Sequence, residues 1–150
     1  MMRTVIVAAA VVTALGCAQS IKGTAGPTRD PLAGTSWQLV RFQGGDDSVL
    51  TPDDRTKYTI ALEADGSVAV RVDCNRGRGT WTSSGPNQVQ LGPLALTRAQ
   101  CPPGSLHDQI VKQWGNVRSY VLKGGRLFLS LMADGGIYEF EPTARGATLD

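Results

Sequence analysis

Two adjacent segments alternate apolar and polar residues with a period of two, and this pattern constrains the fold more than any other feature. The apolar positions are Tyr58, Ile60 and Leu62 in the first segment, and Val68, Val70, Val72 and Cys74 in the second. Such alternation is typical of half-buried strands. The dipeptide Asp65-Gly66 between the segments favours a tight hairpin turn. The sequence therefore predicts an antiparallel hairpin in which Cys74 faces the core.

The same reasoning predicts strands along most of the remaining chain. Short β-favouring runs lie at residues 37–42, 80–82, 89–91, 94–97, 119–122, 127–132 and 137–141. Gly124-Gly125 and Gly135-Gly136 separate the last three runs, and glycine pairs of this kind favour hairpin turns. The sequence thus predicts a mainly antiparallel β domain.

One segment has a helical period instead. Leu106, Ile110, Trp114 and Val117 recur at spacings of four, four and three, as the buried stripe of a helix does. Ser105 precedes the stripe and is a favourable N-cap residue. The expected fold class is α+β and mainly β, with a curled antiparallel sheet or small barrel-like sheet and one packed helix.

The N-terminus has the three parts of a secretory signal peptide. Arg3 supplies a positive charge, Val5 to Leu15 form an apolar run, and small residues stand at Ala14 and Gly16. This run is shorter than the roughly 20 apolar residues needed to span a bilayer. Residues 1–16 are therefore expected to be removed on export.

The sequence Ala14-Leu15-Gly16-Cys17 resembles the lipobox of bacterial lipoproteins, with Cys17 as the acylated first residue of the mature protein. Two acyl chains suffice for stable anchoring in a membrane. Ala14 and Gly16 also satisfy the small-x-small rule of ordinary secretory cleavage, so simple secretion is the alternative. Residues 17–33 are expected to be the lipid-anchored N-terminus and a flexible tether, residues 34–142 the domain, and residues 143–150 a flexible tail.

Charge and cysteine content narrow the partners and the compartment. The chain has 15 Lys and Arg against 13 Asp and Glu, so nothing in its net charge implies a nucleic-acid partner. Once Cys17 is set aside, Cys74 and Cys101 remain, and an even number in an exported domain predicts a disulfide. A metal site and two buried free thiols are the competing interpretations. The lone His107 follows Cys101 without a zinc-ligand pattern, so neither a metal nor a cofactor is expected.

Three short motifs stand in order along the chain: Leu32, Gly34, Thr35 and Trp37, then Cys74, Asn75, Gly79 and Trp81, then Thr97, Arg98, Cys101 and Pro102. Together they resemble the META domain, the module of the heat-shock protein HslJ and of many bacterial envelope lipoproteins. Gln100 departs from the pattern, because a small residue is more usual there. The resemblance implies a mainly antiparallel fold, a link to stress or antibiotic tolerance in some members, and no established catalytic residues.

Candidate binding residues follow from the expected disulfide. A bridge between Cys74 and Cys101 would bring together Asn75, Arg76, Arg78 and Arg98, and arginine forks suit carboxylate or phosphate groups. The alternative is that Asn75 satisfies backbone groups in a turn while the arginines lie in water or pair with acids. His107 lies beside Ser105 and Asp108, but such close neighbours on one helical turn cannot form a catalytic relay.

The sequence therefore predicts an exported, lipid-anchored, non-catalytic protein of the cell membrane or outer membrane. Its expected role is to support envelope integrity or stress and antibiotic tolerance by binding an envelope protein or small ligand. Soluble secreted or periplasmic protein is the alternative location. The alternative function is inhibition of an extracytoplasmic enzyme or carriage of a small ligand. A deep apolar pocket would favour the carrier, and a protruding rigid loop would favour the inhibitor.

Overall fold

The computed structural model describes residues 29–144. The expected signal peptide (1–16), Cys17, the tether as far as residue 28 and the tail from residue 145 lie outside the described residues. Leu32 belongs to the segment assigned above to the tether, yet its side chain is completely buried. Its backbone N–H donates to Asp30 Oδ1 at 2.9 Å, which fixes the turn that leads into the first strand. The folded part thus includes Leu32.

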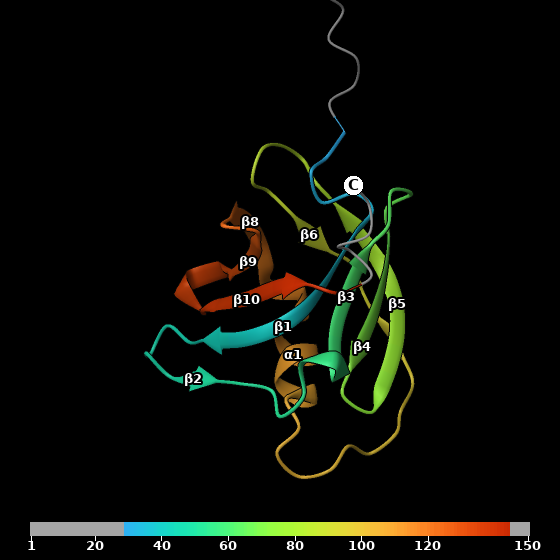
Figure 1. Cartoon of the computed structure of the whole chain (residues 1–150), viewed down its shortest axis with the longest axis vertical. Coiled ribbons are helices and arrows are strands. Elements are labelled where there is room, and N and C mark those ends of the chain that lie inside the picture. The colour runs from blue at the N-terminus through green and yellow to red at the C-terminus, as the bar shows by residue number, and fades with distance from the viewer. Residues whose placement is uncertain (1–28, 145–150) are drawn as a thin grey trace, which may run out of the picture.

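Ten strands, one α-helix and three short 3-10 helices make up the described fold (Figure 1). The strands are β1 (Thr35–Gln43), β2 (Val49–Leu50), β3 (Tyr58–Leu62), β4 (Ser67–Val72), β5 (Asn75–Thr82), β6 (Gln90–Leu91), β7 (Ala95–Leu96), β8 (Val117–Lys123), β9 (Arg126–Leu131) and β10 (Ile137–Pro142). The helices are η1 (Arg55–Lys57), α1 (His107–Gln113), η2 (Trp114–Asn116) and η3 (Met132–Asp134). This is the mainly β architecture that the sequence predicts.

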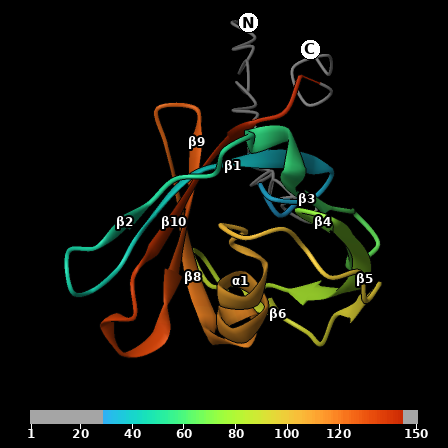
Figure 2. The same ribbon diagram turned by 90° about the horizontal axis from the view of Figure 1, so that it is seen from below.

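The strands form one antiparallel sheet that curls into a nearly closed barrel. Their order is β6-β5-β4-β3-β1-β10-β9-β8, with β2 beside β1 and β7 beside β5. The two ends of the sheet approach each other where Val89 N donates to Arg118 O and Tyr120 N donates to Asn87 O, at 3.1 and 2.9 Å. Figure 2 shows α1 lying in the mouth of this curled sheet.

The core fills the inside of the curl, because alternate residues of each strand point inward. The predicted hairpin is present as β3 and β4, and Gly66 makes its turn with a positive φ of 83°. The buried side chains of that hairpin are Tyr58, Ile60, Leu62, Val68, Val70 and Val72.

Among the described residues, no helix is long and apolar enough to cross a membrane.

The predicted helix is shorter than its apolar stripe. Leu106, Ile110 and Trp114 pack against the core, but α1 ends at Gln113 and Trp114 begins the 3-10 turn η2. Val117, placed on the helix by its spacing, instead opens strand β8 and is buried there. A 3-10 turn has three residues per turn, so it changes the periodicity while keeping the side chains on the same core. Ser105, the predicted N-cap, lies one residue before the observed N-cap Leu106. Its Oγ accepts from His107 N at 3.1 Å.

The expectation that Cys74 continues the buried face of its strand is wrong. Strand β4 ends at Val72, and Asp73 and Cys74 form a two-residue turn that pairs Val72 with Asn75. Asp73 adopts a positive φ of 55°, a conformation that Asp tolerates in tight turns. The turn interrupts the period of two. Asn75 is therefore buried, whereas Cys74 is half-buried.

Candidate binding site around the disulfide

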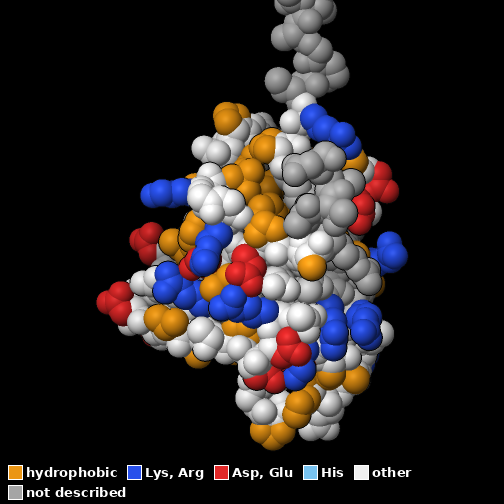
Figure 3. All heavy atoms as spheres, in the orientation of Figure 1, with side chains coloured by type: hydrophobic (Ala, Val, Ile, Leu, Met, Phe, Trp, Pro, Cys, Tyr) orange, Lys and Arg blue, Asp and Glu red, His pale blue; other side chains and the backbone are white. Residues whose placement is uncertain are grey.

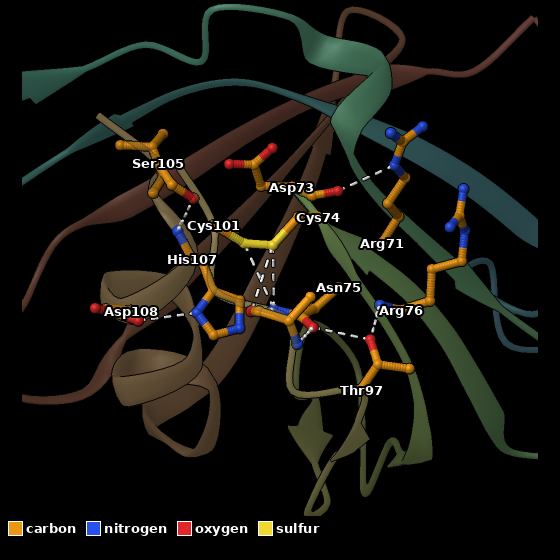
Figure 4. Close-up of a disulfide and its surroundings, with 12 residues drawn as sticks. Arg71, Asp73, Cys74, Asn75, Arg76, Thr97, Cys101, Ser105, His107 and Asp108 are labelled. Carbon is orange, nitrogen blue, oxygen red and sulfur yellow. Dashed lines mark hydrogen bonds and ion pairs between the residues drawn. A yellow bond between two sulfur atoms is a disulfide. The ribbon is translucent and has the colours of Figure 1, made fainter. Parts of the chain in front are cut away.

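Cys74 and Cys101 form a disulfide, as their even number predicts. Their Cα atoms are 5.4 Å apart, and the bond joins the β4–β5 turn to the loop that precedes α1 (Figure 4). A link between segments 27 residues apart restricts the unfolded chain and so stabilises the fold. The disulfide also fixes the position of Asn75, which directly follows Cys74.

The Asn75 side chain is completely buried, and its polar atoms are used within the protein. Its Oδ1 accepts from Thr97 Oγ1 and from Ala99 N, both at 2.8 Å. Its Nδ2 donates to Ala99 O at 2.9 Å and lies 3.5 Å from both disulfide sulfurs. Since buried polar groups are costly when unpaired, this set of bonds holds the loop against β5. Asn75 satisfies backbone groups, and the described contacts occupy its amide.

The predicted arginines lie on two different surfaces. Arg76 and Arg78 alternate outward along β5 and are exposed. Arg98 follows β7 and lines another hollow, together with Leu96 and His107. Thr97 N donates to Arg76 O at 2.9 Å, so the two motif segments, residues 74–81 and 97–102, do meet along their backbones. The exposed side chains of Arg76 and Arg98 nevertheless line different hollows.

Arg71 is a neighbour of Arg76 that the sequence reasoning missed. It stands directly opposite Arg76 in the β4–β5 ladder, and both residues line one groove on the outside of the sheet. Figure 4 shows the two guanidinium groups side by side, extending away from the disulfide. The sequence does contain a signal for this position. Arg71 lies between the inward-facing residues Val70 and Val72, so the alternation of the strand turns its side chain outward.

Three other arginines on the outer face have carboxylate partners. Arg41 Nε lies 2.7 Å from Glu139 Oε2, and Arg126 bonds the other oxygen of Glu139. Burial opposes ionisation of Glu139, but the hydrogen bonds from these arginines outweigh it and hold its pKa below the usual value. Arg55 bonds Glu141 at 2.8 Å. Figure 3 shows Lys and Arg side chains interspersed with Asp and Glu side chains across the face formed by β10, β1 and the β3–β4 hairpin.

His107 has a carboxylate neighbour, but among residues 29–144 no hydroxyl or thiol group bonds its ring. Its Nδ1 lies 2.9 Å from Asp108 Oδ1, while its Nε2 is buried and has no hydrogen-bond partner among residues 29–144. Ser105 Oγ accepts from the backbone N–H of His107. A serine nucleophile would have to donate to an imidazole nitrogen, and Ser105 does not.

The interior offers little room for a ligand. A cavity of about 40 Å³ lies between the sheet and α1, lined by apolar side chains such as Leu39, Ile110 and Trp114. Tyr138 also borders it, donates its hydroxyl hydrogen to Gln113 Oε1, and has its pKa raised by burial to about 12. Sites for small organic molecules are roughly 300 to 1,000 Å³. Within residues 29–144 there is also no group of three or more His, Cys, Asp or Glu side chains that could hold a metal ion.

Comparison with known proteins identifies the family. Residues 30–144 match the family model described as META domain, which covers most of the chain. The protein therefore belongs to the META domain family, as its motifs suggest. No curated protein matches the sequence.

Solved structures with a similar fold share few residues with this chain. An NMR structure of a protein from Burkholderia xenovorans is 21% identical, with a TM-score of 0.63 over 76% of this chain and 85% of that one. A crystal structure of a DUF4847 family protein from Bacteroides vulgatus ATCC 8482 is 18% identical, with a TM-score of 0.55 over 74% of this chain and 94% of that one. These likenesses extend to the fold alone.

Proposed function

We propose that this protein is an exported, lipid-anchored META-domain module that acts by binding and not by catalysis. The acylated residue is Cys17, and the module lies on the outer side of the cell membrane or at the outer membrane. There it supports envelope integrity under stress or antibiotic exposure by binding an envelope protein or a small ligand. It needs neither a metal nor a cofactor, and it does not bind nucleic acid.

The observation that carries this proposal is the disulfide with Asn75 beneath it. Disulfides persist in oxidising compartments and are rare in the cytosol, which agrees with the signal-peptide pattern at residues 1–16. The side-chain amide of Asn75 bonds Thr97 and Ala99, so the contact between residues 74–81 and residues 97–102 has a structural role. Exposed Arg76 and Arg78 on β5, beside this cluster, remain available for binding.

The absence of catalysis gives a direct prediction for His107. The wild type and His107→Ala should both lack activity in a screen of ester, peptide, glycoside and phosphate-ester substrates, because His107 Nε2 faces no nucleophile among the described residues. Asp108→Asn is the matched control, since it removes the neighbour of Nδ1 but keeps the imidazole. A robust activity that disappears in His107→Ala would show that the protein is an enzyme.

Inhibition of an extracytoplasmic enzyme remains the second candidate, because of the loop between β7 and α1. This loop forms the lower end of the molecule in Figure 1. Its exposed residues include Gln100, Pro102 and Pro103, while Cys101 ties it to the β4–β5 turn. Rigid exposed loops are suited to enzyme clefts, because little conformational entropy is lost on binding. The small interior cavity disfavours the carrier function.

A further inference from the structure

Arg71 and Arg76 form a pair of like charges on the outer face of the sheet. Strands β4 and β5 place the two residues directly opposite each other. Side chains in this relation are close neighbours, and like charges there destabilise the sheet. The pair therefore carries an electrostatic cost in the free protein that a bound anion would relieve.

No described carboxylate pairs with either guanidinium group. Arg71 Nε donates to the backbone oxygen of Asp73 at 3.2 Å, while the Asp73 carboxylate points away from Arg71 in Figure 4. A longer contact of 3.5 Å joins Arg71 to Thr56 O. Arg76 uses its backbone N–H to bond Thr97 Oγ1, and its guanidinium group has no partner among residues 29–144. By contrast, Arg41, Arg55 and Arg126 all have glutamate partners.

A groove runs from this arginine pair across the outside of the sheet. Its volume is about 590 Å³, and Ser36, Gln38, Thr59, Ala61 and Ala69 line it beside the two arginines. These side chains are short or polar and come from β1, β3 and β4. A hollow of this size is sufficient for a small organic group next to a bound anion.

We propose that Arg71 and Arg76 bind a phosphate group whose organic substituent lies in this groove. One bidentate arginine satisfies a carboxylate, whereas a phosphate has enough acceptor oxygens for two guanidinium forks. A phosphate between the two side chains would also remove their mutual repulsion. The proposal deepens the binding function proposed above and does not depend on the lipid anchor.

Arg78 adds positive charge beside the proposed site but is not one of its principal ligands. It faces Ala69 across the ladder, two residues beyond Arg76 on the same outward face. Hydrogen bonds from Ser67 lower the pKa of nearby Asp65, and the charge of Arg78 adds a small further lowering. Asp65 therefore offsets part of the Arg78 charge, so Arg71 and Arg76 remain the principal phosphate ligands.

The test is a titration of the full chain, labelled with nitrogen-15 and held in an uncharged detergent, with inorganic phosphate at constant ionic strength. The arginine Nε–Hε signals of Arg71 and Arg76 should move saturably. Arg71→Gln and Arg76→Gln should each raise the dissociation constant by at least about tenfold, as expected for the loss of a charge-assisted hydrogen bond. Arg76→Lys should weaken binding less, because it keeps the charge and loses the fork.

Arg98→Gln is the matched control, because Arg98 is exposed and lines a different hollow. Its dissociation constant should equal that of the wild type, and amide spectra should show that every variant is folded. Glycerophosphoglycerol, the deacylated headgroup of phosphatidylglycerol, separates the two possible sources of phosphate. Tighter binding of this headgroup than of glycerol 3-phosphate assigns the site to a lipid headgroup, and the reverse assigns it to a free phosphate compound. Inorganic phosphate binding tighter than both would contradict an organic substituent in the groove.

Three results would overturn the phosphate site. They are shifts that never saturate, a dissociation constant unchanged in both Arg71→Gln and Arg76→Gln, and acetate binding as tight as phosphate binding. Any of these refutes the site while leaving an anchored, non-catalytic protein intact. Conversely, an unmodified Cys17 or a catalytic His107 would refute the proposed function without changing the phosphate titration.

Discussion

Cys74→Ser and Cys101→Ser should each lower the free energy of unfolding by about 2 to 5 kcal/mol, measured by denaturant titration under oxidising conditions. The disulfide joins segments 27 residues apart and holds the β4–β5 turn against the loop before α1. Removing it frees the unfolded chain and loosens the environment of Asn75. The double variant should be no less stable than either single variant, because both changes remove the same constraint.

The wild type in a reducing agent supplies the control for this prediction. Once reduced, it should lose about as much stability as the serine variants, and the reducing agent should leave the double variant unchanged. Peptide mapping without reduction should recover the Cys74 and Cys101 peptides as one linked species. Two alkylatable thiols in protein taken from the envelope, with no linked peptide, would contradict the disulfide.

Asn75→Ala should lower the free energy of unfolding by about 2 to 3 kcal/mol, close to the effect of losing the disulfide. The substitution leaves Thr97 Oγ1 and both backbone groups of Ala99 without the partners that Asn75 supplies. It also opens a cavity at a position that is completely buried. Thermal or denaturant unfolding measures the loss.

Neighbouring substitutions make the Asn75 result specific. Thr97→Val removes the bond to Asn75 Oδ1 and also the acceptor of the Arg76 backbone N–H, so it should cost about 1 to 2 kcal/mol. Arg98→Gln changes an exposed side chain in the same loop and should stay within about 0.5 kcal/mol of the wild type. If Asn75→Ala were as mild as Arg98→Gln, the amide would not be holding the loop.

Asn75→Asp adds a test with a defined pH dependence. An aspartate at this position can donate to Ala99 O only when its carboxyl is protonated. Burial also disfavours the charged carboxylate, so both effects should raise the pKa of the aspartate in the folded state. Below about pH 3.9, the value for unfolded aspartate, the carboxyl is protonated in both states and the ionisation penalty vanishes. The penalty should then grow as the pH rises towards 7. A pH-independent difference from the wild type would contradict this environment.

The hairpin β3–β4 is the part of the fold that the sequence predicts best, for a clear physical reason. Its apolar residues alternate without interruption from Val68 to Val72, and Gly66 supplies the conformation that the turn requires. Local pattern and tertiary burial therefore agree. The prediction fails at Cys74, because the left-handed conformation of Asp73 starts a new turn one residue after the strand ends.

The proposed phosphate site at Arg71 and Arg76 was harder to predict from the sequence, because it depends on strand register. Arg71 and Arg76 are five positions apart in the chain, and only a two-residue turn at Asp73 and Cys74 brings them opposite each other. Near-neutral net charge also gives no sign that two arginines stand opposite each other. The helix prediction failed at Val117 for a related reason, since η2 changes the periodicity between Trp114 and β8.

Mass spectrometry of the N-terminal peptide, from protein purified out of the membrane fraction, tests the central claim most directly. The lipobox-like sequence before Cys17 predicts a mature chain that begins at Cys17, carries acyl groups and partitions into detergent. Cys17→Ser should abolish both the acyl mass and the partitioning, because serine has no thiol to acylate. An unmodified peptide that begins at Cys17 or Gln19 would contradict the anchor and would identify the protein as simply secreted.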